Sequence, residues 1–502
     1  MEENISSLSD LQLKIGDIFT PGEWACFAIQ QGNLFERWMN GASIFDPTMG
    51  TGQLLEAFIQ TGLNKGYTTA EMPIYQLFGN ELNQEYYNRA LERFSQDFGV
   101  DMTRNFSNED LFKIATRPFD IILGNPPWQN FNNLPPLYKE KIKPWFAHYG
   151  LIKNPRNLLL GGSRIDIAAL VIRKALHDFL AHKGEAWFFM PLSLMLNDGA
   201  HESFRNYQVG EISYSPVTIY DFHKTKVFSK VATRYGLIHF QRDQEPAFPI
   251  PYHILKKETW ETFQAAPVHQ ASAPLSIYRP NQPPPLRDYQ CIRTRRYSTP
   301  RQGINTSGAN EVFFFKTYER ISDTTCVVNG ETKLPLRFVY PLLMNANFKS
   351  EDHPPKAWVL IPHNAEGRPL SEEELGEYPD LKAYLRRHYE KLNNRKGTLI
   401  NSWLKKGIWW ALLGVGPYNF APFKIVWEAY GKKEFNPLLV EGQWQANQSL
   451  QAFMPFSDRE EAAKILKKLQ DPVIEEYLLS MKMEGTMNWA QPGKIKKLFQ
   501  FD

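Results

Sequence analysis

Cysteine, long apolar runs and net charge are all scarce in this chain of 502 residues. The cysteines Cys26, Cys291 and Cys326 lie far apart, so they indicate neither a disulfide framework nor a zinc site, and a reducing cytoplasm fits them. No stretch is long and apolar enough to span a membrane, and the N-terminus has no signal-peptide pattern. The formal net charge is only +3, so nucleic-acid binding has to be argued from local patches.

The composition is that of a folded protein with more than one core. Hydrophobic residues make up 43% of the chain and aromatic residues 14%, which excludes an intrinsically disordered chain. Because single hydrophobic cores stop growing well below this length, we expect at least two domains.

The motif Asn125-Pro126-Pro127-Trp128 follows an apolar run over residues 119–124, which predicts a buried strand. The motif therefore begins where a strand ends, the place where open α/β sheets bind ligands. Proline has no N–H group, so the loop is stiff and its carbonyl groups stay free. Acceptor oxygens beside an aromatic face suit an exocyclic amino group on a planar base. An ordinary Asn-Pro-Pro turn is the alternative.

A second loop, Asp46-Pro47-Thr48-Met49-Gly50-Thr51-Gly52, also follows a predicted strand and precedes a predicted helix. Its glycines allow the backbone to approach a ligand, and the helix N-terminus lies beneath it. The spacing is not that of a dinucleotide-binding loop. The alternative is that Asp46 only caps a helix.

Two further acids follow strand-like runs: Glu81 after residues 78–80, and Asp110 in the segment 108–112. Carboxylates are acceptor-only groups, so Glu81 could accept both hydroxyl groups of a ribose. Taken singly, both acids would be solvated surface residues. Their order, between two glycine or proline loops, favours a shared site.

Taken together, these segments resemble the gamma-type DNA adenine-N6 methyltransferases, which depend on S-adenosylmethionine. The resemblance implies an α/β fold, with a Rossmann-like methyltransferase mixed sheet flanked by helices and a C-terminal α+β target-recognition domain. It implies that the cofactor contacts Thr20, Pro21, Asp46, Thr48, Gly50, Gly52, Glu81, Asp110, Leu111, Asn125 and Pro127. Thr20 and Pro21 also fit a plain helix start, with Thr20 as the cap and Pro21 as the first helical residue.

By the same resemblance, Asn125, Pro126, Pro127 and Trp128 are the catalytic residues. Asn125 Oδ1 and the Pro126 carbonyl would accept the two amino hydrogens of a flipped-out base. Trp128 and Phe228 would stack on its two faces, and a core position is the alternative for Phe228. Asn125 favours adenine over cytosine, whereas Trp128 departs from the tyrosine or phenylalanine usual in the family.

The expected domains are a catalytic domain over residues 1–245, a Pro-rich linker over 246–286 and a DNA target-recognition domain over 287–502. The family's first motif begins near Lys14, so we expect no nuclease domain before it. The residues expected to contact DNA are arginines interleaved with a tyrosine: Arg293, Arg295, Arg296, Tyr297 and Arg301.

The predicted function is site-specific methylation of adenine N6 in double-stranded DNA, in a restriction-modification or related system. The expected location is the cytoplasm of a prokaryote, or of a cell carrying a phage-encoded copy, in association with DNA and not with a membrane. No metal is expected. A separately encoded restriction enzyme or defence partner is left open. The alternatives are methylation of RNA or of a protein glutamine, and a non-catalytic sequence-specific DNA-binding protein with a methylase fold.

Overall fold

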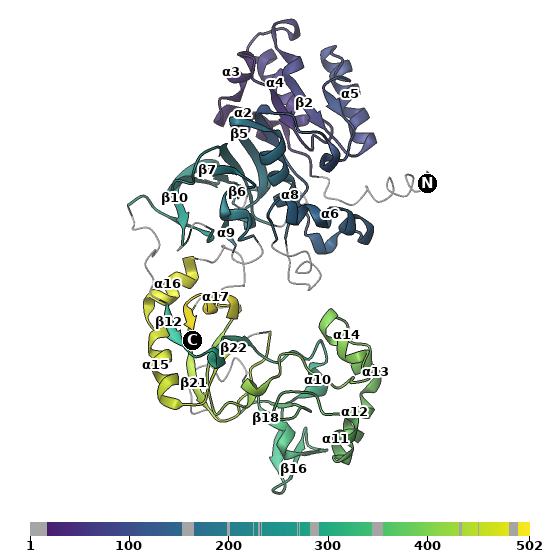
Figure 1. The fold of residues 1–502 in the computed structure, drawn as a ribbon, viewed down its shortest axis with the longest axis vertical. Helices are drawn as coiled ribbons and strands as arrows, with labels where there is room; N and C mark the ends of the chain where they lie inside the picture. The colour runs from purple at the N-terminus through teal and green to yellow at the C-terminus, as the bar shows by residue number, and fades with distance from the viewer. Residues whose placement is uncertain are drawn as a thin grey trace. The chain divides into compact units, whose positions relative to one another are not determined.

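The computed structural model comprises two compact units, Met1–Arg287 and Asp288–Asp502 (Figure 1). The residues that it describes are 18–152, 165–197, 201–223, 225–228, 231, 233–268, 270, 272–281, 291–343, 355–430, 434–449, 451–480 and 490–502.

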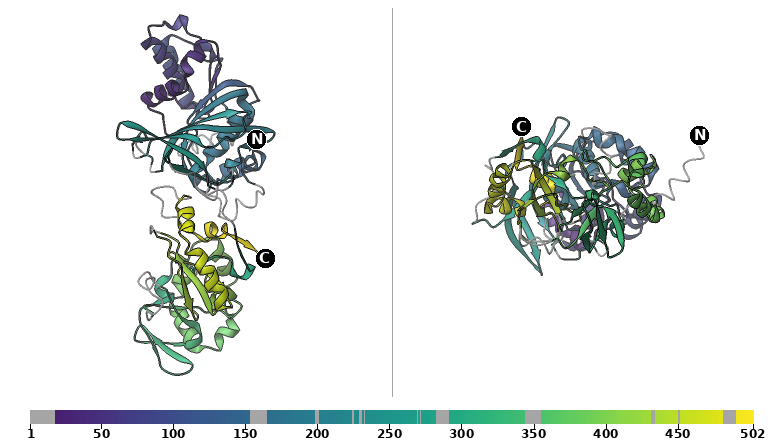
Figure 2. Two further views of the ribbon diagram at one scale, coloured as in Figure 1. Left: turned by 90° about the vertical axis from the view of Figure 1, so that its left-hand side faces the viewer. Right: turned by 90° about the horizontal axis from the view of Figure 1, so that it is seen from below.

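The first unit is built around a large mixed sheet, whose long strands are also visible in Figure 2. The strands are β1 (Ile44–Asp46), β2 (Leu77–Asn80), β3 (Phe106–Ser107), β4 (Phe119–Gly124), β5 (Leu180–Pro191), β6 (Gln208–Val209), β7 (Ile212–Asp221), β8 (Tyr235–Arg242), β9 (Ile250–Lys256), β10 (Thr259–Pro267) and β11 (Leu275–Tyr278). Their order is β11-β10-β9-β7-β8-β5-β4-β1-β2-β3, with β6 paired to β7. Strands β3, β2, β1, β4 and β5 are parallel, and β8 pairs antiparallel with β5 and β7.

Helices flank this sheet. The α-helices are α2 (Gly22–Gln31), α3 (Leu34–Met39), α4 (Gln53–Asn64), α5 (Gln84–Phe98), α6 (Pro136–His148), α8 (Ile167–Lys174) and α9 (Ser193–Leu196). The 3-10 helices are η2 (Thr69–Glu71), η3 (Ile74–Gln76), η4 (Leu111–Lys113), η5 (Phe131–Asn133) and η7 (Phe204–Asn206), and η6 (Ala175–Phe179) is a π-helix.

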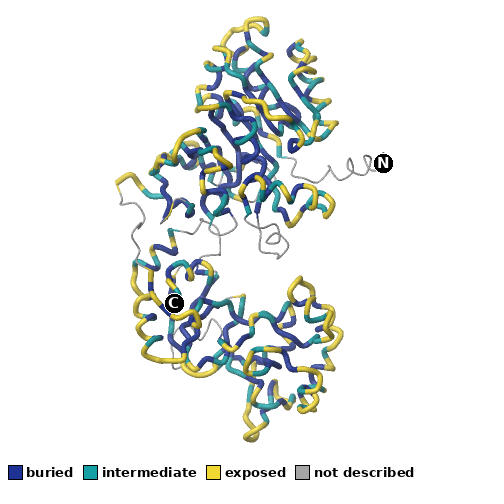
Figure 3. The backbone as a smooth tube through the Cα atoms, viewed as in Figure 1, coloured by how far each residue is buried: buried dark blue, intermediate teal, exposed yellow. Residues whose placement is uncertain are grey.

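Side chains of the central strands alternate between the two faces of the sheet, so both faces pack against other parts of the unit. Ile44 of β1 packs in the core that α2, α3, α4 and α5 share with the sheet. The next residue, Phe45, points to the opposite face and contacts Phe179 of η6, with 5.2 Å between the ring centroids. Parallel strands covered on both faces are largely apolar, as β4 is apart from the exposed Asp120, and Figure 3 shows this part of the chain largely buried.

The predicted linker over residues 246–286 is wrong where the structure describes it. Strands β9, β10 and β11 lie in this segment and extend the sheet, with β9 parallel to β7. The prolines misled the prediction because they occupy tolerated positions. Pro251 precedes the first residue of β9 that pairs with β7, and Pro267 is the last residue of β10.

The second unit carries several small sheets, with orders β12-β23, β13-β22-β20-β21, β14-β19-β18 and β15-β16-β17 among its described residues. The strands are β12 (Ile292–Thr294), β13 (Arg301–Gln302), β14 (Phe314–Phe315), β15 (Tyr318–Arg320), β16 (Thr325–Val328), β17 (Thr332–Pro335), β18 (Val339–Pro341), β19 (Trp358–Leu360), β20 (Phe423–Glu428), β21 (Leu438–Glu441), β22 (Gln451–Phe456) and β23 (Phe499–Phe501).

The helices of the second unit are short. They are α10 (Asn310–Phe313), α11 (Glu372–Gly376), α12 (Pro379–Arg387), α13 (Tyr389–Asn393), α14 (Thr398–Leu404), α15 (Arg459–Leu469), α16 (Pro472–Ser480) and α17 (Pro492–Lys496), with the 3-10 helices η8 (Arg296–Ser298), η9 (Leu336–Phe338) and η11 (Pro417–Phe420). The predicted fold class is thus confirmed: a mixed α/β sheet flanked by helices, with an additional unit later in the chain. Within the part of the chain that the structure describes, no helix has the length and apolar character needed to cross a membrane.

Candidate cofactor and methyl-transfer site

A pocket lies at the carboxyl ends of the parallel strands. β1 lies between β2 and β4, so the chain crosses from one side of β1 to the other between β3 and β4. Ligands bind at such switch points because the loops leaving the two neighbouring strands diverge there. Most of the predicted cofactor residues line the pocket: Thr20, Asp46, Thr48, Gly50, Glu81, Asp110, Leu111, Asn125 and Pro127. Pro21 and Gly52 are not among its lining residues.

The loop after β1 is shaped by glycines in the left-handed region. Gly50 has a φ of 57° and Gly52 a φ of 86°, and Gly52 is the N-cap of α4. A Cβ on Gly50 would lie 3.0 Å from the Phe19 ring, so a larger residue would have to displace that ring and adopt a strained backbone conformation. Met49 N donates to Asn80 O at 2.9 Å, which fixes this loop against the end of β2.

Asp46 is the most strongly perturbed acid of the pocket. It is 1% exposed, and its Oδ1 accepts a hydrogen bond from Thr48 N at 3.0 Å. Burial raises the pKa of Asp46 to about 8, the Thr48 N–H opposes that shift, and the charge of Glu81 adds to it. A buried carboxyl with one backbone donor is a place where a cationic ligand would be stabilised.

Glu81 connects the two loops on either side of it. Its Oε2 accepts a hydrogen bond from Gly50 N at 2.9 Å, and its Oε1 accepts one from Asn83 N at 2.7 Å. Asn83 in turn caps α5 through its side chain, which accepts from Glu85 N and Tyr86 N. The carboxylate is therefore held in one orientation at the end of β2.

Asp110 and Leu111 also line the pocket. Asp110 Oδ1 accepts from Phe112 N at 3.1 Å, and its Oδ2 pairs with Lys141 Nζ of α6 at 2.7 Å. Leu111 is 6% exposed and presents an apolar surface beside that carboxylate. An acid next to an apolar side chain is an arrangement that can bind the edge and the face of a heterocyclic base.

Asn125 has the least expected hydrogen-bond pattern of the site. Its Nδ2 donates to Ile18 O at 2.9 Å and to Thr20 Oγ1 at 3.1 Å. Its Oδ1 is buried, and no described residue donates to it. Buried amide oxygens are normally paired, so an oriented and unpaired acceptor indicates a position for a ligand's N–H group.

The N-terminal segment differs from the plain helix start considered above. Pro21 is the N-cap of α2, the helix begins at Gly22, and no side chain caps it. Thr20 instead directs its hydroxyl oxygen to the Asn125 amide. Lys14 lies outside the described residues.

Trp128 and Phe228 do not have the predicted arrangement around a base. Their ring centroids are 5.0 Å apart with an interplanar angle of 87°, an edge-to-face contact that leaves no room for a base between them. Phe228 is 4% exposed and belongs to the core of the first unit, as its alternative interpretation stated. Trp128 is half-buried, and its Nε1 donates to Phe189 O at 3.2 Å.

The arginines predicted to contact DNA lie in the second unit, and their environments differ. Arg293, Arg295, Arg296 and Tyr297 are exposed. Arg301 is only half-exposed, and its guanidinium carbon lies 3.9 Å from the ring centroid of Tyr418. The exposed group can meet phosphates, whereas Arg301 supports packing within its own unit.

Sequence reasoning missed several residues of the site. Asn80 Nδ2 donates to Pro47 O and Glu109 O, and so ties three loops together. Phe19 and Tyr138 line the pocket as well. The signal for Asn80 was its place at a strand end before Glu81, whereas Tyr138 comes from α6 and has no local signal. Among the described residues, no group of three His, Cys, Asp or Glu side chains could hold a metal ion.

Comparison with known proteins agrees with this geometry. Residues 54–228 match the family model of the Eco57I restriction-modification methylase, which agrees with the predicted resemblance to a DNA methyltransferase family. That range contains Glu81, Asp110 and Asn125, and Asp46 precedes it. No curated protein matches the chain in sequence.

Solved structures of restriction-modification enzymes share the fold. The Type IIL enzyme MmeI in complex with DNA has a TM-score of 0.51 and 13% identity, over 93% of this chain and 63% of that one. A nuclease-deletion mutant of the Type ISP enzyme LlaGI with a DNA substrate mimic has a TM-score of 0.51 and 13% identity, over 98% and 55%.

The ATP-dependent Type ISP enzyme LlaBIII bound to DNA has a TM-score of 0.50 and 11% identity, over 92% of this chain and 36% of that one. The chain thus spans less than two thirds of the length of each of these three proteins. At such identities the likeness concerns the fold alone.

Proposed function

Because residues 54–228 match a restriction-modification methylase family, we propose that this chain is a site-specific DNA methyltransferase. It would methylate the N6 amino group of an adenine flipped out of duplex DNA, in a restriction-modification or related system. The observation that carries the proposal is Asn125 Oδ1, a buried acceptor without a donor among the described residues at the end of β4.

The pocket residues fit S-adenosylmethionine. Asp46 and the loop of Gly50 suit the charged methionine end, Glu81 suits the ribose hydroxyls, and Asp110 with Leu111 suits the adenine ring. When bound, this cofactor supplies a methyl group on a sulfonium sulfur, which departs as a neutral thioether.

The motif residues would act on the target amine. The amine lone pair is delocalised into the base, which makes the nitrogen a poor nucleophile. Asn125 Oδ1 and the Pro126 carbonyl would accept its two hydrogens and favour a pyramidal nitrogen with a localised lone pair. Ile18 O and Thr20 Oγ1 accept both hydrogen bonds of Asn125 Nδ2, which leaves Oδ1 as the amide atom available to the amine. Positioning is the main contribution, and no strong base is required.

The target base would reach this site by leaving the duplex. A base within the stack cannot contact a loop at a sheet end, so it has to be extruded into the pocket. The half-buried Trp128 offers one aromatic face that offsets part of the cost of unpairing. Phe228 would support that indole through its edge-to-face contact.

Sequence recognition is assigned to the second unit. The exposed Arg293, Arg295 and Arg296, with Tyr297 beside them, supply donors for phosphates and base edges. Strands β9, β10 and β11 extend the sheet, so the catalytic domain would include them. A separately encoded restriction enzyme or defence partner would complete the system.

The test is transfer of labelled methyl groups by the purified chain to a mixture of duplex DNA, RNA and protein. We expect label only in duplex DNA. The number of methyl groups per DNA molecule should follow the number of copies of one short sequence. Label in RNA or protein would refute the assigned substrate. Cofactor binding without transfer to any DNA would instead support a non-catalytic DNA-binding protein.

A further inference from the structure

We infer that Lys141 is a positioning residue of the proposed cofactor site, where it holds the Asp110 carboxylate in place to accept a hydrogen bond from the amino group of the cofactor's adenine ring. The inference rests on the proposed function, and it adds a residue from α6, a helix that no motif of the sequence marks.

The contacts of Asp110 define this role. Each carboxylate oxygen has one donor: Phe112 N at 3.1 Å on Oδ1 and Lys141 Nζ at 2.7 Å on Oδ2. A carboxylate oxygen can accept two hydrogen bonds, so both oxygens retain capacity for a ligand N–H group. The Asp110 side chain is 12% exposed, and an ionised acid at that burial needs a counter-charge. Lys141 supplies it.

Helix α6 carries Lys141, and aromatic rings attach this helix to the pocket wall. Trp145 stacks on Phe112, with centroids 5.7 Å apart and an interplanar angle of 21°. Tyr149, just after the helix, continues the stack at 6.0 Å and 23°. Because Phe112 also donates its backbone N–H to Asp110, the same 3-10 turn contacts α6 through both the ion pair and the ring stack.

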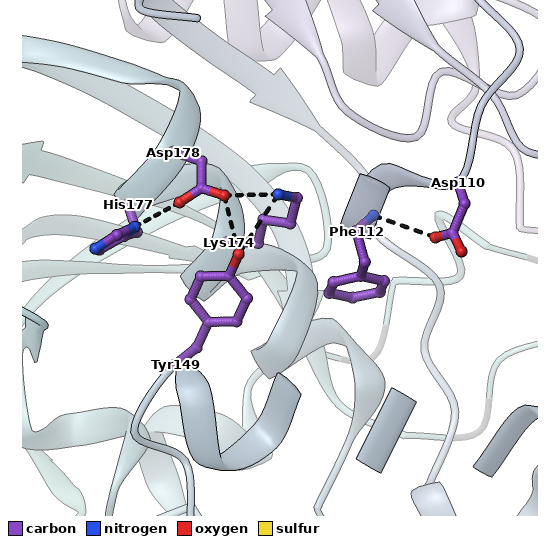
Figure 4. Close-up of polar contacts among 6 residues, drawn as sticks. All are labelled: Asp110, Phe112, Tyr149, Lys174, His177 and Asp178. Atoms are coloured by element: carbon purple, nitrogen blue, oxygen red, sulfur yellow. Dashed lines mark hydrogen bonds and ion pairs between the residues drawn. The ribbon is translucent and has the colours of Figure 1, made fainter. Parts of the chain in front are cut away.

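A buried polar cluster fixes the far end of this helix, as Figure 4 shows. The Tyr149 hydroxyl donates to Asp178 Oδ2 at 2.9 Å, and Lys174 Nζ lies 2.6 Å from the same oxygen. His177 Nδ1 lies 2.5 Å from Asp178 Oδ1. Lys174 is 3% exposed in its side chain, so this ion pair is shielded from solvent. The cluster therefore anchors α6 without help from Lys141.

The role of Lys141 can be tested separately because other contacts hold α6 in place. The stack and the Asp178 cluster hold the helix, so replacing Lys141 should leave α6 in place and change only the charge at Asp110. Tyr138 of the same helix lines the pocket, and its pKa is raised by burial and by the nearby Asp110 charge. A phenol is never positively charged, so Tyr138 cannot replace Lys141 as the counter-charge of Asp110.

The experiment measures dissociation constants by calorimetry for S-adenosylhomocysteine and for S-inosylhomocysteine, which has a carbonyl oxygen in place of the adenine amino group. The proteins are the wild type, Lys141→Met, Lys141→Arg and the control Lys143→Met. Lys143 pairs with Glu140 on the same helix, at 3.6 Å.

We expect Lys141→Met to weaken binding of the adenosyl ligand roughly tenfold, the effect of one hydrogen bond to a charged group. Binding of the inosyl ligand should not change, Lys141→Arg should restore most of the loss, and Lys143→Met should match the wild type.

Three outcomes would overturn the inference. Equal losses for both ligands would mean that Lys141 only supports the packing of α6. Unchanged or tighter binding of the adenosyl ligand would mean that Lys141 is dispensable or competes for Asp110. A wild-type protein that binds neither ligand would refute the proposed function itself, and the inference with it.

Discussion

Asn125 in the first unit and Arg395 in the second are both polar side chains in protein interiors, but they differ in how completely they are paired. Arg395 is 6% exposed, and its guanidinium donates to four carbonyl groups, those of Leu392, Thr306, Ala411 and Trp409. Asn125 donates two hydrogen bonds through Nδ2, to Ile18 O and Thr20 Oγ1, while its buried Oδ1 has no donor among the described residues.

This difference separates a structural polar group from one that is kept for a ligand. A buried cation with all these hydrogen bonds, such as Arg395, joins segments that lie far apart in the sequence. Its loss would leave several acceptors unpaired. An unpaired acceptor costs stability in the free protein, and it persists where a function requires it.

The largest effect is expected for Asn125→Ala. Methyl transfer should fall roughly 10³-fold, because an acceptor aimed at the reacting amine is lost. The free energy of unfolding should fall by about 2 kcal/mol, at roughly 1 kcal/mol for each of the two acceptors that Nδ2 leaves unpaired, and no buried charge is exposed. Methyl incorporation, ligand affinity and thermal unfolding are measured together.

Asn130→Ala is the matched control on the same loop, because Asn130 Oδ1 accepts only a local bond from Asn132 N at 3.0 Å among those described. It should retain most of the activity. If Asn125→Ala still methylated at a comparable rate, the assigned mechanism would be wrong.

Arg395→Met should have the opposite effects, a large loss of stability and little loss of methyl transfer. We expect it to lower the free energy of unfolding of the second unit by about 4 kcal/mol, at roughly 1 kcal/mol for each of the four unpaired carbonyl groups. Arg386→Met serves as the control, because Arg386 is exposed and lies 3.7 Å from Glu372, and its loss should cost less than about 0.5 kcal/mol. Equal effects in chemical denaturation would remove the structural role assigned to Arg395.

Asp46 tests the intermediate case of a buried acid with a single backbone donor. Its pKa is raised to about 8 in the folded protein, so between about pH 4 and pH 8 the folded protein binds more protons than the unfolded chain. Its contribution to the free energy of unfolding therefore decreases as pH rises through that window. The stability gained by Asp46→Asn should grow by about 3 kcal/mol from pH 5 to pH 8. A pH-independent difference in thermal unfolding would contradict the shift.

The smallest effects concern the second unit's arginines. Arg296→Ala should leave the melting temperature unchanged and reduce the slope of log K against log salt for DNA binding by about 0.9, the value for one phosphate contact. Arg301→Ala should instead lower stability by about 1 kcal/mol through loss of its contact with Tyr418. An unchanged salt slope for Arg296→Ala would remove that residue from the DNA surface.

Local patterns were enough to predict the centre of the site. Asp46, Glu81 and Asn125 each follow an apolar strand, and parallel strands bring their carboxyl ends to one edge of the sheet, so residues far apart in sequence converge there. Strand β4 was expected because a short apolar run with clear boundaries specifies it.

Long-range packing was not predictable from such patterns. Lys141 contacts Asp110 only because α6 folds back onto a 3-10 turn 30 residues earlier, and no spacing in the sequence marks this contact. The perpendicular contact of Phe228 with Trp128 likewise depends on core packing. The proline-rich segment was misassigned because proline at the margin of a strand costs little, although it signals a break.

The most direct test of the account is single-molecule sequencing of DNA from cells that express this chain, beside cells that express Asn125→Ala. The account predicts N6-methyladenine at one recurrent short sequence, and its loss in the variant. Methylated cytosine at that sequence, or methyladenine that persists in the variant, would contradict it.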